Sequence, residues 1–145
     1  MQVRKILVVC VGNICRSPVG EFLLRDALPG TEISSAGIGA LVGHPADATA
    51  AEVATANGLS LEGHVARQFT PSLGAAQDLI LVMEAGHKRE IERLSPQLAG
   101  RTMLFDQWTG KQGIADPYQK SRAFHEAAFV EIKAAAGAWA QRLKR

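Results

Sequence analysis

A cysteine and an arginine are separated by five residues near the amino terminus, in the segment CVGNICRSP that spans residues 10–18. A turn of this length can curl so that successive backbone N–H groups point inward and bind the oxygens of a phosphate group. Arg16 can complete the ring with a planar guanidinium that donates two hydrogen bonds to such oxygens. The same positive field favours a thiolate on Cys10, which would then be a nucleophile. These residue types at this spacing predict covalent chemistry on a bound phosphate group.

The other residues of this segment fit the same chemistry. Gly12 and Asn13 tolerate a positive φ, which a curled loop requires. Ser17 is near enough to donate a hydrogen bond to the Cys10 thiolate, and a helix that starts at Ser17-Pro18 would add its positive end. The alternative is that Cys10 is a buried cysteine at a strand end, since free cysteines are commonly core residues. The combination of a glycine, an arginine and a helix start favours the chemical interpretation.

Spacing argues against two other uses of this loop. The Gly-Lys-Ser/Thr ending of a nucleotide-binding loop is missing, and Cys10 and Cys15 are too far apart for a CxxC redox or zinc pair. The four histidines are dispersed along the chain, so we predict no metal site; they are His44, His64, His87 and His125.

Strands and helices are expected to alternate along the chain. Apolar residues predict strands at residues 3–10, 31–36, 78–83 and 101–105, and helices at residues 17–28, 46–57 and 88–94. A long final helix has its apolar positions at Phe124, Ala128, Ile132, Ala135, Trp139 and Leu143. Such alternation predicts an α/β fold with a parallel sheet between helices. Ligands of these sheets bind at the carboxyl ends of the strands, where residues 10–17 lie.

Length and composition indicate a single domain of residues 1–145. The net charge of +2 and the scattered Lys and Arg residues argue against a nucleic acid partner. Apolar runs fall short of the ~20 residues of a membrane span, so we expect no membrane insertion. Two cysteines without a secretory leader favour a reducing compartment, and we expect a cytoplasmic protein that is a monomer.

The segment CVGNICRSP resembles the active-site loop of the low-molecular-weight protein tyrosine phosphatases. Other segments follow in the family's order: Ser35-Ala36-Gly37, His44-Pro45-Ala46-Asp47, residues 64–68, Met83 at a strand end and Asp116-Pro117-Tyr118. The resemblance covers almost the whole chain and implies a three-layer sandwich whose four parallel strands are ordered 2-1-3-4. Residues 39–43 and 59–64 resemble the bacterial branch that acts on tyrosine autokinases of capsule or exopolysaccharide export.

The resemblance also implies roles for individual residues. Asp116 would be the general acid, although an Asp-Pro pair by itself is equally a turn initiator. The phosphate would be bound by Val11, Gly12, Asn13, Ile14, Cys15, Arg16 and Ser17. A supporting network would join Asn13, Ser17, Ser35 and His64, and the pocket rim would contain Leu41 and Tyr118. From the residues alone, His64 is also consistent with an exposed loop histidine and Tyr118 with packing.

The implied reaction is hydrolysis of phosphotyrosine in a protein through a cysteinyl phosphate, with no metal ion and no organic cofactor. The partner would be a tyrosine-phosphorylated protein. An arsenate reductase on this scaffold would need further cysteines after Cys15, and none follows. A protein-arginine phosphatase would have a threonine at the position of Ile14.

A protein that only binds phosphorylated partners, without hydrolysing the phosphate ester, is a further alternative. Such a phosphate-binding module would have no need of Cys10, Arg16 and Asp116 together.

Cys15 has three open interpretations: a small packing residue, a member of the phosphate-binding loop, or a resolving thiol that forms a reversible disulfide with Cys10.

Overall fold

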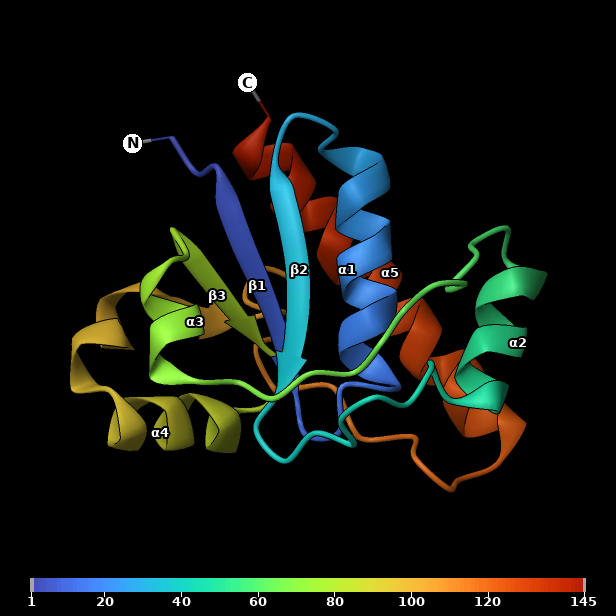
Figure 1. The fold of residues 1–145 in the computed structure, drawn as a ribbon. Helices are drawn as coiled ribbons and strands as arrows, with labels where there is room; N and C mark the ends of the chain where they lie inside the picture. The colour runs from blue at the N-terminus through green and yellow to red at the C-terminus, as the bar shows by residue number, and fades with distance from the viewer. Residues whose placement is uncertain (1, 145) are drawn as a thin grey trace.

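A parallel four-stranded sheet lies between two layers of helices (Figure 1). The computed structural model describes residues 2–144, so Met1 and Arg145, the ends of the predicted domain, lie outside the described residues. The elements in chain order are β1 (Lys5–Cys10), α1 (Arg16–Ala27), β2 (Glu32–Gly37), α2 (Ala48–Ala56), α3 (Pro71–Ala75), β3 (Leu79–Val82), α4 (Ala85–Leu94), the 3₁₀ helix η1 (Pro96–Arg101), β4 (Thr102–Leu104) and α5 (Arg122–Leu143). The strand order β2-β1-β3-β4 confirms the predicted fold.

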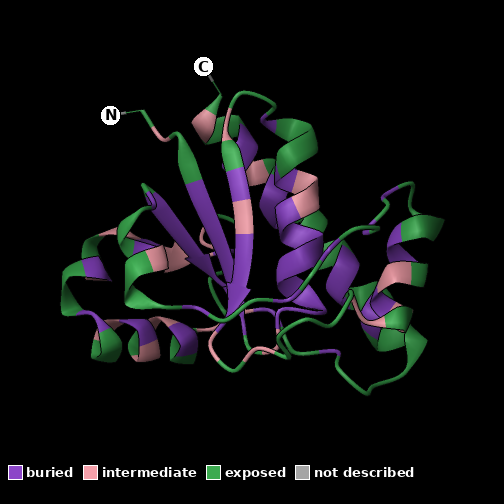
Figure 2. Cartoon of the chain, in the orientation of Figure 1, coloured by how far each residue is buried: buried purple, intermediate pink, exposed green. Residues whose placement is uncertain are grey.

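The central strand β1 is buried on both faces of the sheet. Ile6 and Val8 pack with residues of α1 and α5, whereas Leu7 and Val9 pack on the opposite face with residues of α4 and η1. Figure 2 shows the same pattern, with buried strands inside helices whose outer sides are exposed. Burial of each such side chain stabilises the fold by about 1.5–3 kcal/mol. The strand is therefore a rigid support for Cys10, which is its last residue.

Several elements differ from the predicted ones. Helix α1 begins at Arg16 after Cys15, so Ser17 is not its N-cap, and its hydroxyl is directed to Cys10 instead. Phe124 is 41% exposed. The buried stripe of α5 starts at His125 and returns every three or four residues, and this periodicity leaves Phe124 outside it. The short helices α3 and η1 were not predicted, because one or two turns show no clear periodicity.

The loop of residues 11–15 lies at the carboxyl ends of the strands, whereas β1 begins and α5 ends at the other end of the sheet (Figure 1). The segment of residues 38–47 follows β2 and lies against this loop through backbone hydrogen bonds. Between residues 2 and 144, no helix combines the length and the hydropathy that crossing a membrane requires.

Gly37 allows β2 to approach this loop closely. A Cβ atom on Gly37 would lie 2.2 Å from the carbonyl oxygen of Val11 and 3.0 Å from the backbone nitrogen of Asn13. A Gly37→Ala substitution must displace the loop, and we expect kcat/KM to fall at least about tenfold and stability to fall by roughly 1–3 kcal/mol.

Thermal unfolding and kinetics with an aryl phosphate measure both effects. Gly137→Ala is the matched control, because the added methyl group would meet nothing within 4 Å apart from the adjoining residues and backbone of α5 itself. That control should keep its activity and gain stability as a helix residue. Unchanged kinetics in Gly37→Ala would contradict the close approach.

Candidate active site

The backbone of residues 10–15 turns its carbonyl groups outward and its N–H groups inward. The five carbonyl oxygens of residues 10–14 all accept hydrogen bonds from outside the loop, at 2.6–3.1 Å; the donors are the backbone N–H groups of Ile38, Gly39, Leu41 and Asp47 and the Nε2 atom of His64. In a trans peptide the next N–H points opposite to the carbonyl, so the N–H groups of residues 11–15 face the inside of the loop. Within residues 2–144 none of these N–H groups donates to a protein acceptor. Of the two residues that the sequence singled out for a positive φ, Asn13 has one, +60°, and Gly12 does not.

A cavity of about 160 Å³ opens above this loop. It is lined by Cys10, Val11, Gly12, Ile14, Cys15, Arg16, Gly39, Leu41, Asp116 and Tyr118. The structure thus brings the predicted nucleophile, arginine, acid and rim residues into one pocket, although Asp116 and Tyr118 lie more than 100 positions after Cys10 in the chain. Cys10 is 2% exposed, whereas Leu41 and Tyr118 are 37% and 39% exposed at the rim.

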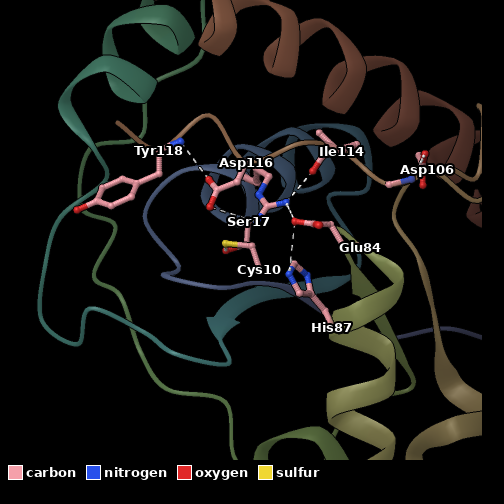
Figure 3. Close-up of polar contacts among 10 residues, drawn as sticks. Cys10, Ser17, Glu84, His87, Asp106, Ile114, Asp116 and Tyr118 are labelled. Carbon is pink, nitrogen blue, oxygen red and sulfur yellow. Dashed lines mark hydrogen bonds and ion pairs between the residues drawn. The ribbon is translucent and has the colours of Figure 1, made fainter. Parts of the chain in front are cut away.

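The guanidinium of Arg16 keeps part of its donors free. Its Nη1 atom uses both hydrogens, one on Glu84 Oε2 at 2.5 Å and one on the carbonyl oxygen of Ile114 at 2.6 Å. Its Nη2 atom lies 3.6 Å from Asp116 Oδ2, and within residues 2–144 its buried Nε atom has no hydrogen-bond partner. Figure 3 shows Cys10, Glu84 and Asp116 gathered at this site. The Nε and Nη2 atoms form one edge of the guanidinium, which is the edge suited to bidentate binding of an oxyanion.

Hydrogen bonds around Cys10 have a defined direction. Asn13 Nδ2 donates to Ser17 Oγ at 2.7 Å and to Ser35 Oγ at 2.9 Å. Since Ser17 Oγ already accepts from Asn13, its own hydrogen is available for Cys10 Sγ, 3.0 Å away. A donor fixed toward the sulfur stabilises a thiolate more than a thiol. The predicted supporting residues Asn13, Ser17 and Ser35 therefore form a connected chain.

Two further contacts hold Asn13 in place. His64 is buried, and its Nε2 atom lies 2.6 Å from the carbonyl oxygen of Asn13. The backbone N–H of Arg67 donates to Asn13 Oδ1 at 2.9 Å. The alternative of an exposed loop histidine is wrong, because His64 belongs to the contacts that shape the loop.

The second cysteine is chemically different from the first. Burial raises the pKa of the Cys15 thiol well above its ordinary value, and the nearby Asp47 carboxylate raises it further. Cys15 therefore carries its proton at neutral pH, which leaves it a poor nucleophile. Both cysteines are free thiols.

Asp116 enters the pocket from the loop that precedes α5. Its side chain is 43% exposed, and its Oδ1 atom accepts a hydrogen bond from the backbone N–H of Tyr118 at 3.0 Å. Asp116 thus has both of the features considered from sequence, a local turn and a carboxyl group in the pocket. A carboxyl group there can exchange a proton with a ligand bound by Arg16.

Glu84 and His87 are site residues that the sequence analysis missed. Glu84 comes one residue after the end of the buried segment that includes Met83, and an acidic residue at the carboxyl end of a strand could have indicated it. His87 Nε2 lies 3.7 Å from Glu84 Oε2. Burial, followed by the charge of Arg16, lowers the pKa of His87 and keeps this ring neutral. Glu84 is therefore the main charged partner that orients Arg16.

The loop of residues 106–114 presents the Ile114 carbonyl to Arg16. Asp106 is buried, and its Oδ2 atom accepts from the backbone N–H groups of Gln112 and Gly113, both at 3.0 Å. These bonds close the loop immediately before Ile114, whose N–H donates to Met83 O at 2.8 Å.

We expect Asp106→Ala to lower kcat/KM about tenfold, because the backbone N–H groups of Gln112 and Gly113 would lose their shared acceptor, at roughly 0.5–1.5 kcal/mol each. Steady-state kinetics should show the loss in kcat/KM, and Asp106→Asn, which keeps one acceptor oxygen, should recover most of it. Equal losses in both variants would contradict this role of the acceptor.

Comparison with known proteins places the chain in a family. A family model described as "Low molecular weight phosphotyrosine protein phosphatase" matches residues 5–145. The low molecular weight protein-tyrosine-phosphatase Etp of Escherichia coli (strain K12) is 49% identical over 145 residues, 100% of this chain and 98% of Etp. The crystal structure of the tyrosine phosphatase Wzb from Escherichia coli K30 in complex with sulphate has a TM-score of 0.96 at 46% identity, with 98% of this chain and 99% of that chain covered.

A third similar protein is named for another substrate. The YwlE arginine phosphatase from Geobacillus stearothermophilus has a TM-score of 0.91 but only 33% identity, with 97% of this chain and 93% of that chain covered. The tyrosine phosphatases are thus closer in sequence than this arginine phosphatase. The family match over nearly the full length agrees with the pocket geometry, and the chain belongs to the low molecular weight phosphotyrosine protein phosphatase family.

Proposed function

We propose that this chain hydrolyses phosphotyrosine in proteins, with Cys10 as nucleophile, Arg16 as phosphate-binding residue and Asp116 as general acid and base. The observation that carries the proposal is the set of free donors around Cys10. The inward N–H groups of residues 11–15 and the Nε–Nη2 edge of Arg16 line one cavity with the sulfur and with Asp116. Such preorganised donors stabilise the charge on the oxygens of a transferring phosphoryl group.

The first step transfers the phosphoryl group to sulfur. The Cys10 thiolate attacks phosphorus, the bond from phosphorus to the phenolic oxygen breaks, and the electron pair leaves with that oxygen. Asp116 gives its proton to the same oxygen, so tyrosine departs as a neutral phenol. The products are a cysteinyl phosphate and an ionised Asp116.

The second step returns the enzyme to its starting state. A water molecule attacks phosphorus while the Asp116 carboxylate accepts one of its protons. The bond from sulfur to phosphorus breaks, inorganic phosphate is released, and the Cys10 thiolate re-forms with Ser17 as hydrogen-bond donor. Arg16 and the loop N–H groups bind the equatorial oxygens in both steps.

The pocket walls favour an aromatic leaving group. Leu41 and Tyr118 line the cavity above Cys10, and their apolar surfaces can contact a phenyl ring. Ile14, where an arginine phosphatase would have threonine, supports the same substrate class, and so does the higher identity to the tyrosine phosphatases Etp and Wzb.

The biological setting is also part of the proposal. Similarity to Etp and Wzb, together with residues 39–43 and 59–64, supports a tyrosine autokinase of capsule or exopolysaccharide export as the phosphorylated partner. We further propose that the chain acts in the cytoplasm as a monomer, with one domain over residues 1–145.

Competing hydrolysis of a phosphotyrosine peptide and a phosphoarginine peptide tests the substrate class. We expect kcat/KM for the phosphotyrosine peptide to be higher by at least about 10²-fold, which corresponds to roughly 2.7 kcal/mol of differential transition-state binding. Preferred hydrolysis of phosphoarginine would contradict the proposal.

Asp116→Ala tests the proposed acid. We expect kcat for phenyl phosphate, whose leaving group is strongly basic, to fall roughly 10²–10⁴-fold, and kcat for a nitrophenyl phosphate to fall much less. Asp26→Ala on the exposed side of α1 is the matched control and should leave both rates unchanged. Equal losses on the two substrates would mean that Asp116 does not protonate the leaving oxygen.

A further inference from the structure

A second cavity is formed by residues of α1, β2 and the segment 63–67, on the other side of the supporting network from Cys10. Its volume is about 320 Å³, and it shares no lining residue with the catalytic pocket. It is lined by Glu21, Phe22, Arg25, Ser34, Ser35, Gly63, His64, Val65 and Arg67. We propose that this cavity is a second oxyanion-binding site, which takes a small free anion such as inorganic phosphate.

The donors of the cavity exceed what the protein uses. Arg67 is exposed and donates from Nε to the carbonyl oxygen of Ser35 at 2.9 Å, and within residues 2–144 its two Nη atoms have no protein acceptor. Arg25 pairs through Nη2 with Glu21 and donates from Nε to the Ile33 carbonyl oxygen. Within residues 2–144 its Nη1 atom has no protein acceptor. The cavity therefore presents guanidinium hydrogens from two arginines to a ligand.

Its single carboxylate is already paired with a hydroxyl and a guanidinium of the protein. Glu21 is 5% exposed; its Oε1 atom accepts from Ser35 Oγ at 2.5 Å and its Oε2 atom lies 2.5 Å from Arg25 Nη2. Two guanidinium groups against one carboxylate give the lining a surplus of one positive charge without counting His64. The balance of donors and charge selects an anion with several acceptor oxygens.

An aromatic side chain restricts how the arginine can move. The Arg25 guanidinium carbon lies 5.0 Å from the centre of the Phe22 ring, and the His64 ring meets that ring edge-on at 6.4 Å. A cation–π contact of this kind restricts the side chain and reduces the entropy lost when the guanidinium binds a ligand. Arg25 is thus partly ordered before the anion binds.

The cavity is connected to the nucleophile through side chains that are already hydrogen-bonded. Ser35 accepts from Asn13, Asn13 donates to Ser17, and Ser17 contacts Cys10 Sγ. Arg67 also donates its backbone N–H to Asn13. A bound anion would be held by the same residues that fix Asn13, although its binding does not depend on the proposed phosphatase activity.

Titration of isotope-labelled protein with inorganic phosphate, at constant ionic strength in sodium chloride, tests this site by NMR. The Gly63 and Val65 amides report on the second cavity, and the Gly12 and Asn13 amides report on the catalytic loop. In the wild type we expect saturable shifts in both groups. In Arg67→Gln and in Arg25→Gln we expect the affinity reported by Gly63 and Val65 to weaken at least tenfold, while Gly12 keeps its midpoint.

Two controls make the result decisive. Arg89→Gln removes an exposed arginine of α4 far from the cavity and should leave every midpoint unchanged. Thermal unfolding and the amide spectrum of the remaining residues establish that both cavity variants are folded. The proposal is overturned if Gly63 and Val65 keep their midpoint in the folded Arg67→Gln and Arg25→Gln variants, or if they titrate only together with Gly12 in every protein.

Discussion

Cys10→Ser is expected to lower kcat on an aryl phosphate by on the order of 10⁵-fold or more, which is the usual scale for loss of an enzyme nucleophile. The hydroxyl of serine is not ionised at neutral pH, and in the second step a serine alkoxide would be a poorer leaving group from phosphorus than the cysteine thiolate. The inward N–H groups and Arg16 remain in this variant, so phosphate binding should persist. Steady-state kinetics together with the inhibition constant of inorganic phosphate measure the two effects separately.

Cys10→Ala serves as the second variant for this prediction. It should be as inactive as Cys10→Ser, since neither provides a thiolate, and both should unfold near the wild-type temperature because the substitutions are small. Turnover by either variant within tenfold of the wild type would remove Cys10 from the mechanism. The phosphate-binding module considered from the sequence would then be the better description.

Arg16→Lys is expected to lower kcat/KM by roughly 10³–10⁵-fold. This is the usual contribution to the rate of an arginine that stabilises a transferring phosphoryl group. Lysine keeps the positive charge beside Glu84, yet it lacks the planar Nε–Nη2 edge that is free toward the pocket. It also cannot reach the oxyanion and the Ile114 carbonyl with the same geometry. The loss should appear mainly in kcat, because the edge contacts the oxygens most strongly in the transition state.

The control for this substitution is Arg89→Lys on the exposed side of α4, which should leave the kinetics unchanged. Thermal unfolding separates a chemical effect from misfolding, since Arg16 is only 1% exposed and its replacement disturbs a packed position. A folded Arg16→Lys enzyme with kcat/KM within tenfold of the wild type would show that charge alone, rather than the bidentate edge, accounts for the role of Arg16.

The parts of the site that are local in the sequence could be predicted from it. The strand, loop and helix start around Cys10 and Arg16 occupy consecutive residues, so their types and spacing define the loop. The positive φ of Asn13 and the contact of Ser17 with Cys10 follow from the same short segment. The parallel sheet was predictable because strands and helices alternate along the chain.

The parts that depend on distant chain segments were not predictable from the residues alone. Glu84 contacts Arg16 across 68 positions of sequence, and Ile114 does so through a backbone carbonyl that any residue type provides. Gly37 is necessary because β2 approaches Val11 closely, and only coordinates reveal that distance. Asp106 acts through a loop whose closure has no characteristic motif.

The most direct test of the account is the identity of the atom that carries phosphorus during turnover. The enzyme is mixed with a phosphotyrosine peptide, quenched in acid within the first turnover, digested and analysed by mass spectrometry with fragmentation. We expect a peptide of residues 6–16 heavier by one HPO₃ unit, with fragment ions that assign the added mass to Cys10 rather than Cys15. Rapid hydrolysis with no phosphorylated cysteine, or with phosphorus on Cys15, would contradict it.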